Sequence, residues 1–330
     1  MALQFEHPVK DWAREWAAIC HQWKRVGYVP GVSRRAEFRG LTTRGQLIEA
    51  FPDKNMIRCS ILNLKKEAVQ RYADEIRNQK IDFLHGYPSA FYLLAKQIKD
   101  SGIDFPEPEA ILLASEEVFD WQLLQIKEIF PNAKLHASYG CAERTVMAGW
   151  CEHRQEYHVL PQYSLVEVDE TTNELIGTNL FNTLNGFVRY RMSDTVIKIE
   201  NEPCPDCGRP YTPRLIELGG RSEDYLFSSE NGWISPAILT YPFKELKSIQ
   251  EIQLVQRKIN EVEVGYTLRI KADANLVKHD ITQIQHGLHD LLGKEMIINF
   301  TLVDGFPRGP TGKFKWVVCE LDEMPRTSNP

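Results

Sequence analysis

The sequence predicts an α/β protein with a parallel sheet at its core, a strand-rich region after it and a small α+β domain at the C-terminal end. Strands and helices alternate between residues 81 and 138, which is the pattern of a parallel sheet. From Leu165 onward, short runs of branched residues are separated by turns, which indicates strands alone. A chain of 330 residues is long enough for two domains. Because paired glycines free the backbone to bend, we place the boundary at Gly219-Gly220 and expect domains at 1–220 and 221–330.

Apolar periodicity predicts the individual helices and strands. Between Trp12 and Val26 apolar residues recur every three or four positions, and Gly27 follows as a helix terminator. Ser89 stands where the N-terminal cap of a helix is expected. The predicted helices cover 9–26, 64–78, 90–99, 120–129 and 276–292. The predicted strands cover 81–85, 110–114, 134–138, 164–168, 175–177, 187–191, 196–199, 250–256, 262–270 and 297–302.

Composition and charge exclude several classes of protein. The formal net charge is -6 and charges of both signs are interleaved, whereas a nucleic-acid binder presents a basic face. No apolar run reaches the ~18 residues of a membrane-spanning helix, and the N-terminus lacks the basic and apolar regions of a signal peptide. Seven cysteines at irregular positions do not form a secreted disulfide framework. We therefore expect a cytoplasmic protein that binds neither nucleic acid nor a membrane.

Five short segments carry residues suited to binding a nucleotide, and several of them follow predicted strands. Ligands of parallel sheets bind beyond the carboxyl ends of the strands, which is where such residues are expected. Taken separately, each segment is equally explained as a turn, a helix start or a solvated loop. The segments are Ser115-Glu116-Glu117, Tyr139-Gly140-Cys141-Ala142-Glu143, Tyr190-Arg191-Met192-Ser193-Asp194, Gly220-Arg221-Ser222-Glu223-Asp224 and Gly312-Lys313.

The order of these segments resembles the phenylacetate-CoA ligase family of adenylate-forming enzymes, most closely its capsular-polysaccharide biosynthesis (CapK-like) branch. The resemblance extends from Phe83 to Lys313. It implies an adenylate-forming (ANL-type) fold, with a truncated N-terminal α/β domain, a strand-rich subdomain and a small mobile α+β C-terminal domain. It also implies ATP-dependent activation of a carboxylic acid as an acyl-adenylate in a biosynthetic pathway. Mg²⁺ would be a cofactor, and CoA or another nucleophile the acceptor.

The resemblance assigns roles to residues of the predicted core domain. Tyr139 and Gly140 match the turn that contacts the adenine and the acyl group, and Glu143 matches its Mg²⁺ ligand. Asp194 matches the carboxylate that holds the ribose hydroxyls, although Ser193 replaces the glycine that usually precedes it. These residues would bind ATP and, after the reaction, AMP.

Further residues receive roles in the same way. Ser115-Glu116-Glu117 falls on the adenine-lining loop, and His85-Gly86-Tyr87-Pro88 falls on the lining of the acyl pocket. Arg221 would approach phosphate, Glu223 would be the hinge, and Lys313 would stabilise charge as the carboxylate attacks the α-phosphate. Because both reacting groups are anionic, this chemistry needs cations and positioning more than a nucleophilic side chain.

One feature of the family has no counterpart in the sequence. Relatives carry a Ser/Thr- and Gly-rich loop that wraps the β- and γ-phosphates through backbone N–H groups, and residues 1–5 resemble the segment directly after that loop. The start is then assigned too late, or the protein is a catalytically impaired remnant that binds nucleotide or an aromatic or acyl carboxylate as an accessory protein. A third interpretation is a fragment that works with a separate N-terminal piece. A surface left bare on the Trp12 and Trp16 helix would favour a homodimer.

A Cys-x-x-Cys knuckle, Cys204 to Cys207, lies in the strand-rich region. With Cys151 and His158 it fits a closed tetrahedral Zn²⁺ site of structural type. His153 and Cys141 are substitute ligands, and two free thiols in a turn are the alternative. Some relatives in the resembled family have a similar cluster, which favours the zinc site.

Overall fold

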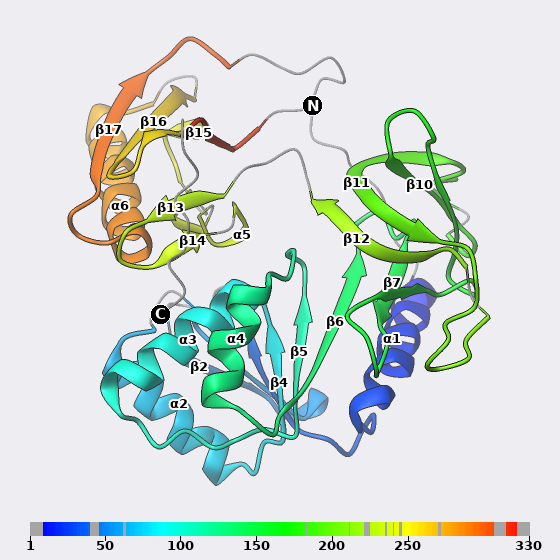
Figure 1. The fold of residues 1–330 in the computed structure, drawn as a ribbon. Helices are drawn as coiled ribbons and strands as arrows, with labels where there is room; N and C mark the ends of the chain where they lie inside the picture. The colour runs from blue at the N-terminus through cyan, green and yellow to red at the C-terminus, as the bar shows by residue number, and fades with distance from the viewer. Residues whose placement is uncertain are drawn as a thin grey trace. The chain divides into compact units, whose positions relative to one another are not determined.

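The computed structural model describes residues 9–39, 46–61, 64–182, 184–210, 212–220, 225–234, 236–239, 241–243, 246–269, 272–306 and 315–321. The chain divides into two compact units, Met1–Arg221 and Ser222–Pro330 (Figure 1). Gly219-Gly220, where the sequence predicts the boundary, ends the last strand of the first unit. No helix within the described residues is long and apolar enough to cross a membrane.

The first unit is built on a sheet of twelve strands in the order β2-β3-β1-β4-β5-β6-β7-β8-β12-β11-β10-β9. The strands from β3 to β6 in this order pair in parallel, and the pairs on either side are antiparallel. The strands are β1 (Arg35–Phe38), β2 (Ile48–Phe51), β3 (Met56–Cys59), β4 (Phe83–Gly86), β5 (Ala110–Ala114), β6 (Lys134–Gly140), β7 (Met147–Trp150), β8 (Tyr157–Val159), β9 (Ser164–Val168), β10 (Glu174–Asn179), β11 (Tyr190–Glu200) and β12 (Arg214–Gly220).

Helices cover both faces of the parallel strands (Figure 1). They are α1 (Val9–Trp23), continued by a 3₁₀ turn at Lys24–Val26, α2 (Lys66–Asn78), α3 (Pro88–Ser101) and α4 (Asp120–Ile129), with a further 3₁₀ turn at Pro52–Lys54. On one face Phe38 packs against Tyr72 of α2 and Phe91 of α3. On the other face Trp23 of α1 and Phe83 of β4 belong to one buried apolar cluster. The alternation of side chains along a strand produces these two layers.

The ends of the predicted helices are corrected at two places. α1 follows the predicted stripe, but its last turn tightens into the 3₁₀ form before Gly27, whose φ of 101° suits glycine. Ser89 does not cap the next helix, because α3 already begins at Pro88 and places Ser89 inside its first turn. Proline is favoured at the first helical position, where its missing N–H costs no hydrogen bond.

The α/β fold class is confirmed, while the strands differ from the prediction in several regions. The predicted strands 187–191 and 196–199 are one strand, β11, with an irregular register against β12 at Thr195. The sequence does not predict β1, β2, β3, β7, β8 and β12 of the first unit, nor the strands Leu226–Ser228, Gly232–Ile234 and Val317–Cys319 of the second. All of these except β12 have only three or four residues, and charged side chains such as Arg35 and Glu37 stand inside β1. So short a strand gives no readable periodicity.

The second unit combines a small sheet with one long helix, as an α+β domain does. Its four-stranded sheet has the order β17-β16-β15-β18, and β13 and β14 form a separate pair. The Asp273 side chain caps α6 by accepting hydrogen bonds from the backbone N–H groups of Asn275 and Leu276. The elements are β13 (Leu226–Ser228), β14 (Gly232–Ile234), α5 (Pro236–Leu239), a 3₁₀ turn (Tyr241–Phe243), β15 (Ile249–Lys258), β16 (Glu261–Leu268), α6 (Ala274–Leu292), β17 (Ile297–Leu302) and β18 (Val317–Cys319).

Gly86 provides a test of how closely β1 and β4 approach. A Cβ at this position would lie 2.3 Å from the Phe38 carbonyl oxygen, and the backbone of a paired strand cannot move aside. We expect Gly86→Ala to lower the free energy of unfolding in urea by about 1–3 kcal/mol. Gly140→Ala is the matched control, since its Cβ would lie 3.5 Å from the nearest atom. Equal stability of the two variants would contradict the prediction.

Candidate functional site

Two hydrogen bonds between tyrosines and carboxylates join the end of β6 to the start of β11. The Tyr139 hydroxyl donates to Asp194 Oδ2 over 2.6 Å, and the Tyr190 hydroxyl donates to Glu143 Oε1 over 3.1 Å. Asp194 is only 6% exposed. Because β7, β8 and β12 stand between β6 and β11 in the sheet, the sheet must curve to bring these side chains together. We name these four residues the tyrosine–carboxylate cluster.

The turn after β6 is held against β10 by close backbone packing. A Cβ on Gly177 would lie 2.5 Å from the Thr145 carbonyl oxygen, so only glycine allows this approach. Asn179 donates from its side chain to the Arg144 carbonyl oxygen over 2.6 Å. Gly177 also pairs with Tyr190 in the sheet. These contacts fix Glu143 and Tyr190 relative to each other.

The loop after β5 lies next to the tyrosine–carboxylate cluster, because Ala114 pairs with Ser138 of β6. Ser115 is exposed and has a backbone φ of 71°, a value that residues other than glycine rarely adopt. Glu116 accepts hydrogen bonds from the Ser89 N–H at 3.1 Å and the Ser89 hydroxyl at 2.5 Å. It thereby pairs a backbone N–H of the first turn of α3, which has no partner within the helix. Burial raises the pKa of the Glu117 carboxyl, and the nearby Glu217 carboxylate raises it further.

The segment His85-Gly86-Tyr87-Pro88, which is expected to line an acyl pocket, is largely buried. His85 is buried, with its ring 4.9 Å from that of Trp23 and its Nδ1 3.5 Å from Glu37 Oε1. Burial lowers the pKa of His85 to about 4. Burial alone would raise the pKa of Glu37, but its hydrogen bonds with His85 and Arg58 hold it at about 2. Tyr87, in contrast, is half-buried beyond the end of β4.

Three predicted site residues lie outside the described part of the chain. They are Arg221, Glu223 and Lys313, which were predicted to approach phosphate, to act as a hinge and to stabilise charge. Their roles stay predictions from the sequence.

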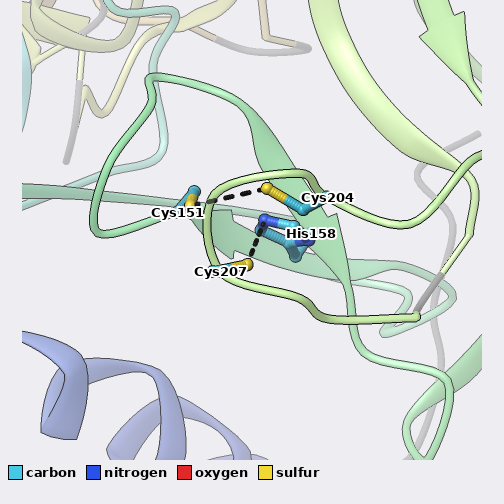
Figure 2. A group of neighbouring side chains, drawn as sticks. All are labelled: Cys151, His158, Cys204 and Cys207. Atoms are coloured by element: carbon cyan, nitrogen blue, oxygen red, sulfur yellow. Dashed lines mark hydrogen bonds between the residues drawn. The ribbon is translucent and has the colours of Figure 1, made fainter.

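The second group of predicted residues converges in the strand-rich region (Figure 2). The ligand atoms of Cys151, His158, Cys204 and Cys207 all lie within 4.8 Å of one another. The Cys151 and Cys204 sulfurs are 4.0 Å apart, and Cys207 Sγ is 3.6 Å from His158 Nε2. Tetrahedral Zn²⁺ with Zn–S bonds of about 2.3 Å places its ligand atoms ~3.8 Å apart, so the four residues fit this ion.

The local backbone and charges suit such a cluster. Gly208, with a φ of 68°, donates from its N–H to the Cys204 carbonyl oxygen over 2.9 Å and closes the knuckle. Burial and the Arg25 guanidinium lower the pKa of His158 to about 4, so its ring is neutral, as a metal ligand must be. The substitute ligands are not needed, because Cys141 contacts Thr145 instead and only the backbone N–H of His153 reaches Cys151.

Two residues near these sites had no assigned role in the sequence. Tyr190 stood inside a recognised segment, but no spacing rule connects its hydroxyl to Glu143. Arg39 follows β1, a strand too short to be predicted, and its Nη2 donates to the Ser115 hydroxyl over 3.2 Å. A correct prediction of β1 would have placed Arg39 at the carboxyl edge of the sheet.

The chain has the fold of adenylate-forming ligases. It is similar to 2-hydroxyisobutyryl-CoA ligase in complex with 2-HIB-AMP and CoA in the thioesterification state, with a TM-score of 0.56, 17% identity and coverage of 96% of this chain and 71% of that chain. For the postadenylation state of the same enzyme with R3-HIB-AMP, the TM-score is 0.54 at 18% identity, with the same coverage of both chains. An open conformation gives a TM-score of 0.51 at 17% identity, covering 95% of this chain and 72% of that chain.

Sequence comparison adds a more particular finding for the second unit. Residues 226–320 match the family model of the CapK C-terminal domain. The fold and this domain together support the predicted CapK-like adenylate-forming family. A comparison with curated proteins gives no match.

Because burial lowers the pKa of His85, we expect the protein to lose stability in mild acid. Its pKa is about 4 in the folded protein and ~6.5 when unfolded, so only the unfolded chain takes up the proton between these values. We expect the free energy of unfolding to fall as the pH is lowered from 6.5 toward 4, with His85 contributing on the order of 2–3 kcal/mol. Urea titrations across this range measure the slope. His85→Gln should reduce this slope, to which the buried His136 with its pKa of about 3 also contributes, and His279→Gln, on an exposed helix face, should leave it unchanged; equal slopes in wild type and His85→Gln would refute this origin.

Proposed function

We propose that this protein activates a carboxylic acid as an acyl-adenylate, using ATP and Mg²⁺, with CoA or another nucleophile as the acceptor. The observation that carries the proposal is the tyrosine–carboxylate cluster at the carboxyl edge of the sheet. Ligands of open α/β sheets bind at this edge. Neighbours with this fold are described in complex with an acyl-AMP and with CoA, which supports the choice of ligands.

Each member of the cluster has a proposed task. An ionised carboxylate accepts about four hydrogen bonds, so Asp194 can receive ribose hydroxyls while it keeps the bond from Tyr139. Tyr190 orients the Glu143 carboxylate, which would hold Mg²⁺. The ion would offset phosphate charge when bound. The acid carboxylate then attacks the α-phosphorus, the bond to pyrophosphate breaks, and Lys313 and Arg221 would stabilise the charge that develops.

The accessory-protein hypothesis is the alternative, and it differs in one measurable respect. The absence of a phosphate loop stays a prediction from the sequence, and a protein without that loop would bind nucleotide yet release pyrophosphate inefficiently. Binding and turnover must therefore be measured on the same preparation. A biosynthetic role is proposed with the ligase function, because the resemblance of the sequence to the CapK-like branch implies it.

Pyrophosphate exchange over a panel of carboxylic acids tests the ligase proposal. We expect acid-dependent exchange, and we expect Asp194→Asn to reduce kcat/KM by about 10- to 100-fold, because charged hydrogen bonds to the ribose are lost. Glu170→Gln, an exposed turn position, is the control. Saturable ATP binding by the wild-type protein without exchange for any acid would favour the accessory protein. Neither binding nor exchange would refute both hypotheses.

We further propose that Cys151, His158, Cys204 and Cys207 hold a structural Zn²⁺. Four protein donors leave no open position for a substrate, which favours a structural role. The ion would tie the residue after β7, strand β8 and the turn before β12 together. Zn²⁺ bound only to the folded state stabilises that state.

Metal analysis of the purified protein tests this site. We expect one Zn²⁺ per chain, lost in Cys204→Ser, and a lower Tm after treatment with a chelator. Cys319→Ser, in the second unit, should retain the metal. A metal-free wild-type protein whose Tm does not respond to added Zn²⁺ would contradict the assignment.

A further inference from the structure

Three parallel strands of the first unit end side by side, and each is followed directly by a residue of one small group. Arg39 follows β1, Tyr87 follows β4 and Ser115 follows β5. The Arg39 guanidinium lies over the Tyr87 ring, with its carbon 5.6 Å from the ring centroid. Its Nη2 donates to the Ser115 hydroxyl over 3.2 Å. We name these three residues the Arg39 cluster.

The positive charge of Arg39 has no carboxylate partner among the residues that the structure describes. Some arginines of this unit are ion-paired, such as Arg58 with Glu37 at 2.8 Å, whereas Arg34, among the described residues, donates only to a backbone carbonyl oxygen. The Tyr87 ring and the Ser115 hydroxyl hold the guanidinium in place without neutralising it. A guanidinium stays protonated in proteins, and its parallel N–H groups match a carboxylate in two hydrogen bonds. The cluster therefore offers a fixed cation to an anionic ligand.

The Arg39 cluster lies beside the tyrosine–carboxylate cluster, and its Ser115 also belongs to the predicted adenine-lining loop. In the sheet order β1-β4-β5-β6, Tyr139 ends β6, while the Arg39 cluster occupies the ends of the three strands on one side of it. β1 is three strands from β6, but the Arg39 guanidinium reaches Ser115 at the end of β5, the strand next to β6. Since neighbouring strands are ~4.8 Å apart, an anion on this guanidinium lies about 5–10 Å from a group held at the end of β6. Tyr87 belongs to the segment predicted to line the acyl pocket. An anion on Arg39 is thus placed on the side of β6 where the chain of the acid is expected.

We propose that Arg39 selects acids with a second carboxylate, and that it binds this distal group while the other carboxylate is adenylated. The inference rests on the proposed adenylation and names its class of substrate as dicarboxylic acids. A monocarboxylic acid would leave the cation facing an apolar chain end. Losing charged hydrogen bonds of this kind corresponds to a preference of about 10- to 100-fold.

The test is acid-dependent pyrophosphate exchange by the full chain with matched pairs of acids. The pairs are succinate with butyrate, glutarate with valerate, and adipate with hexanoate. We expect a higher kcat/KM for at least one diacid than for its partner, by about 10- to 100-fold. Arg39→Met should abolish this preference. Arg39→Lys should retain part of it, because lysine is a point charge without the two-pronged geometry.

Arg34→Met is the matched control. Arg34 precedes β1 at the opposite end of the strand, and its Nη1 donates to the Gln79 carbonyl oxygen over 2.7 Å. This variant should keep the preference for diacids. A wild-type protein that prefers the monoacid of every pair, or an unchanged ratio in Arg39→Met, would overturn the inference.

A separate binding measurement distinguishes failure of this inference from failure of the adenylation proposal. If no acid supports exchange, adenylation fails, and calorimetric titration with the three diacids then decides the role of Arg39. Diacid binding that survives in Arg34→Met and is lost in both Arg39→Met and Arg39→Gln supports the anion site. Absence of diacid binding to the wild-type protein overturns it. Circular dichroism identifies any variant that does not fold.

Discussion

Parallel pairing of β1, β4, β5 and β6 is the constraint on which the proposed chemistry depends. Parallel strands must all end at the same edge, so residues that are far apart in the sequence become neighbours there. Arg39, Tyr87, Ser115 and Tyr139 are placed in this way. The close approach at Gly86, where the neighbouring Phe38 carbonyl fills the space of a side chain, keeps the edge in register. Helices on both faces bury the strands, so the edge is the position left for ligands.

The strands β7, β8, β12 and β11 curve so that the start of β11 returns to the end of β6, and this completes the tyrosine–carboxylate cluster. Tyr139 and Asp194 belong to strands separated by three others, yet their side chains share a short hydrogen bond. The reciprocal arrangement, in which Tyr190 contacts Glu143, ties the same two segments a second time. Each tyrosine thereby orients one carboxylate, which is the preorganisation that an anionic reaction needs from its binding groups. The cysteine and histidine cluster joins β8 to the turn before β12, the strands that connect the two halves.

Charge is distributed unevenly among the buried and half-buried groups of the first unit. Glu37 is compensated by Arg58, and burial keeps His85 neutral near pH 7, so these residues stabilise the sheet without offering charge to a ligand. Glu143 accepts a hydrogen bond from a neutral hydroxyl, and Arg39 is held by a ring and a hydroxyl. Such partners fix a charged group and leave its charge available. This difference separates the proposed site from the structural ion pairs around it.

The sequence by itself determined the alternation of strands and helices from 81 to 138, the strand-rich region, and the four residues of the cysteine and histidine cluster. Apolar periodicity and the Cys-x-x-Cys knuckle depend only on residues close together in the sequence, so both can be predicted without coordinates. Only the tertiary structure decided that Glu116 accepts a hydrogen bond from the first turn of α3, that Tyr190 donates to Glu143, and that Arg39 donates to Ser115. Those contacts join residues separated by 27 to 76 positions, and only the packing of strands brings such residues within hydrogen-bonding distance.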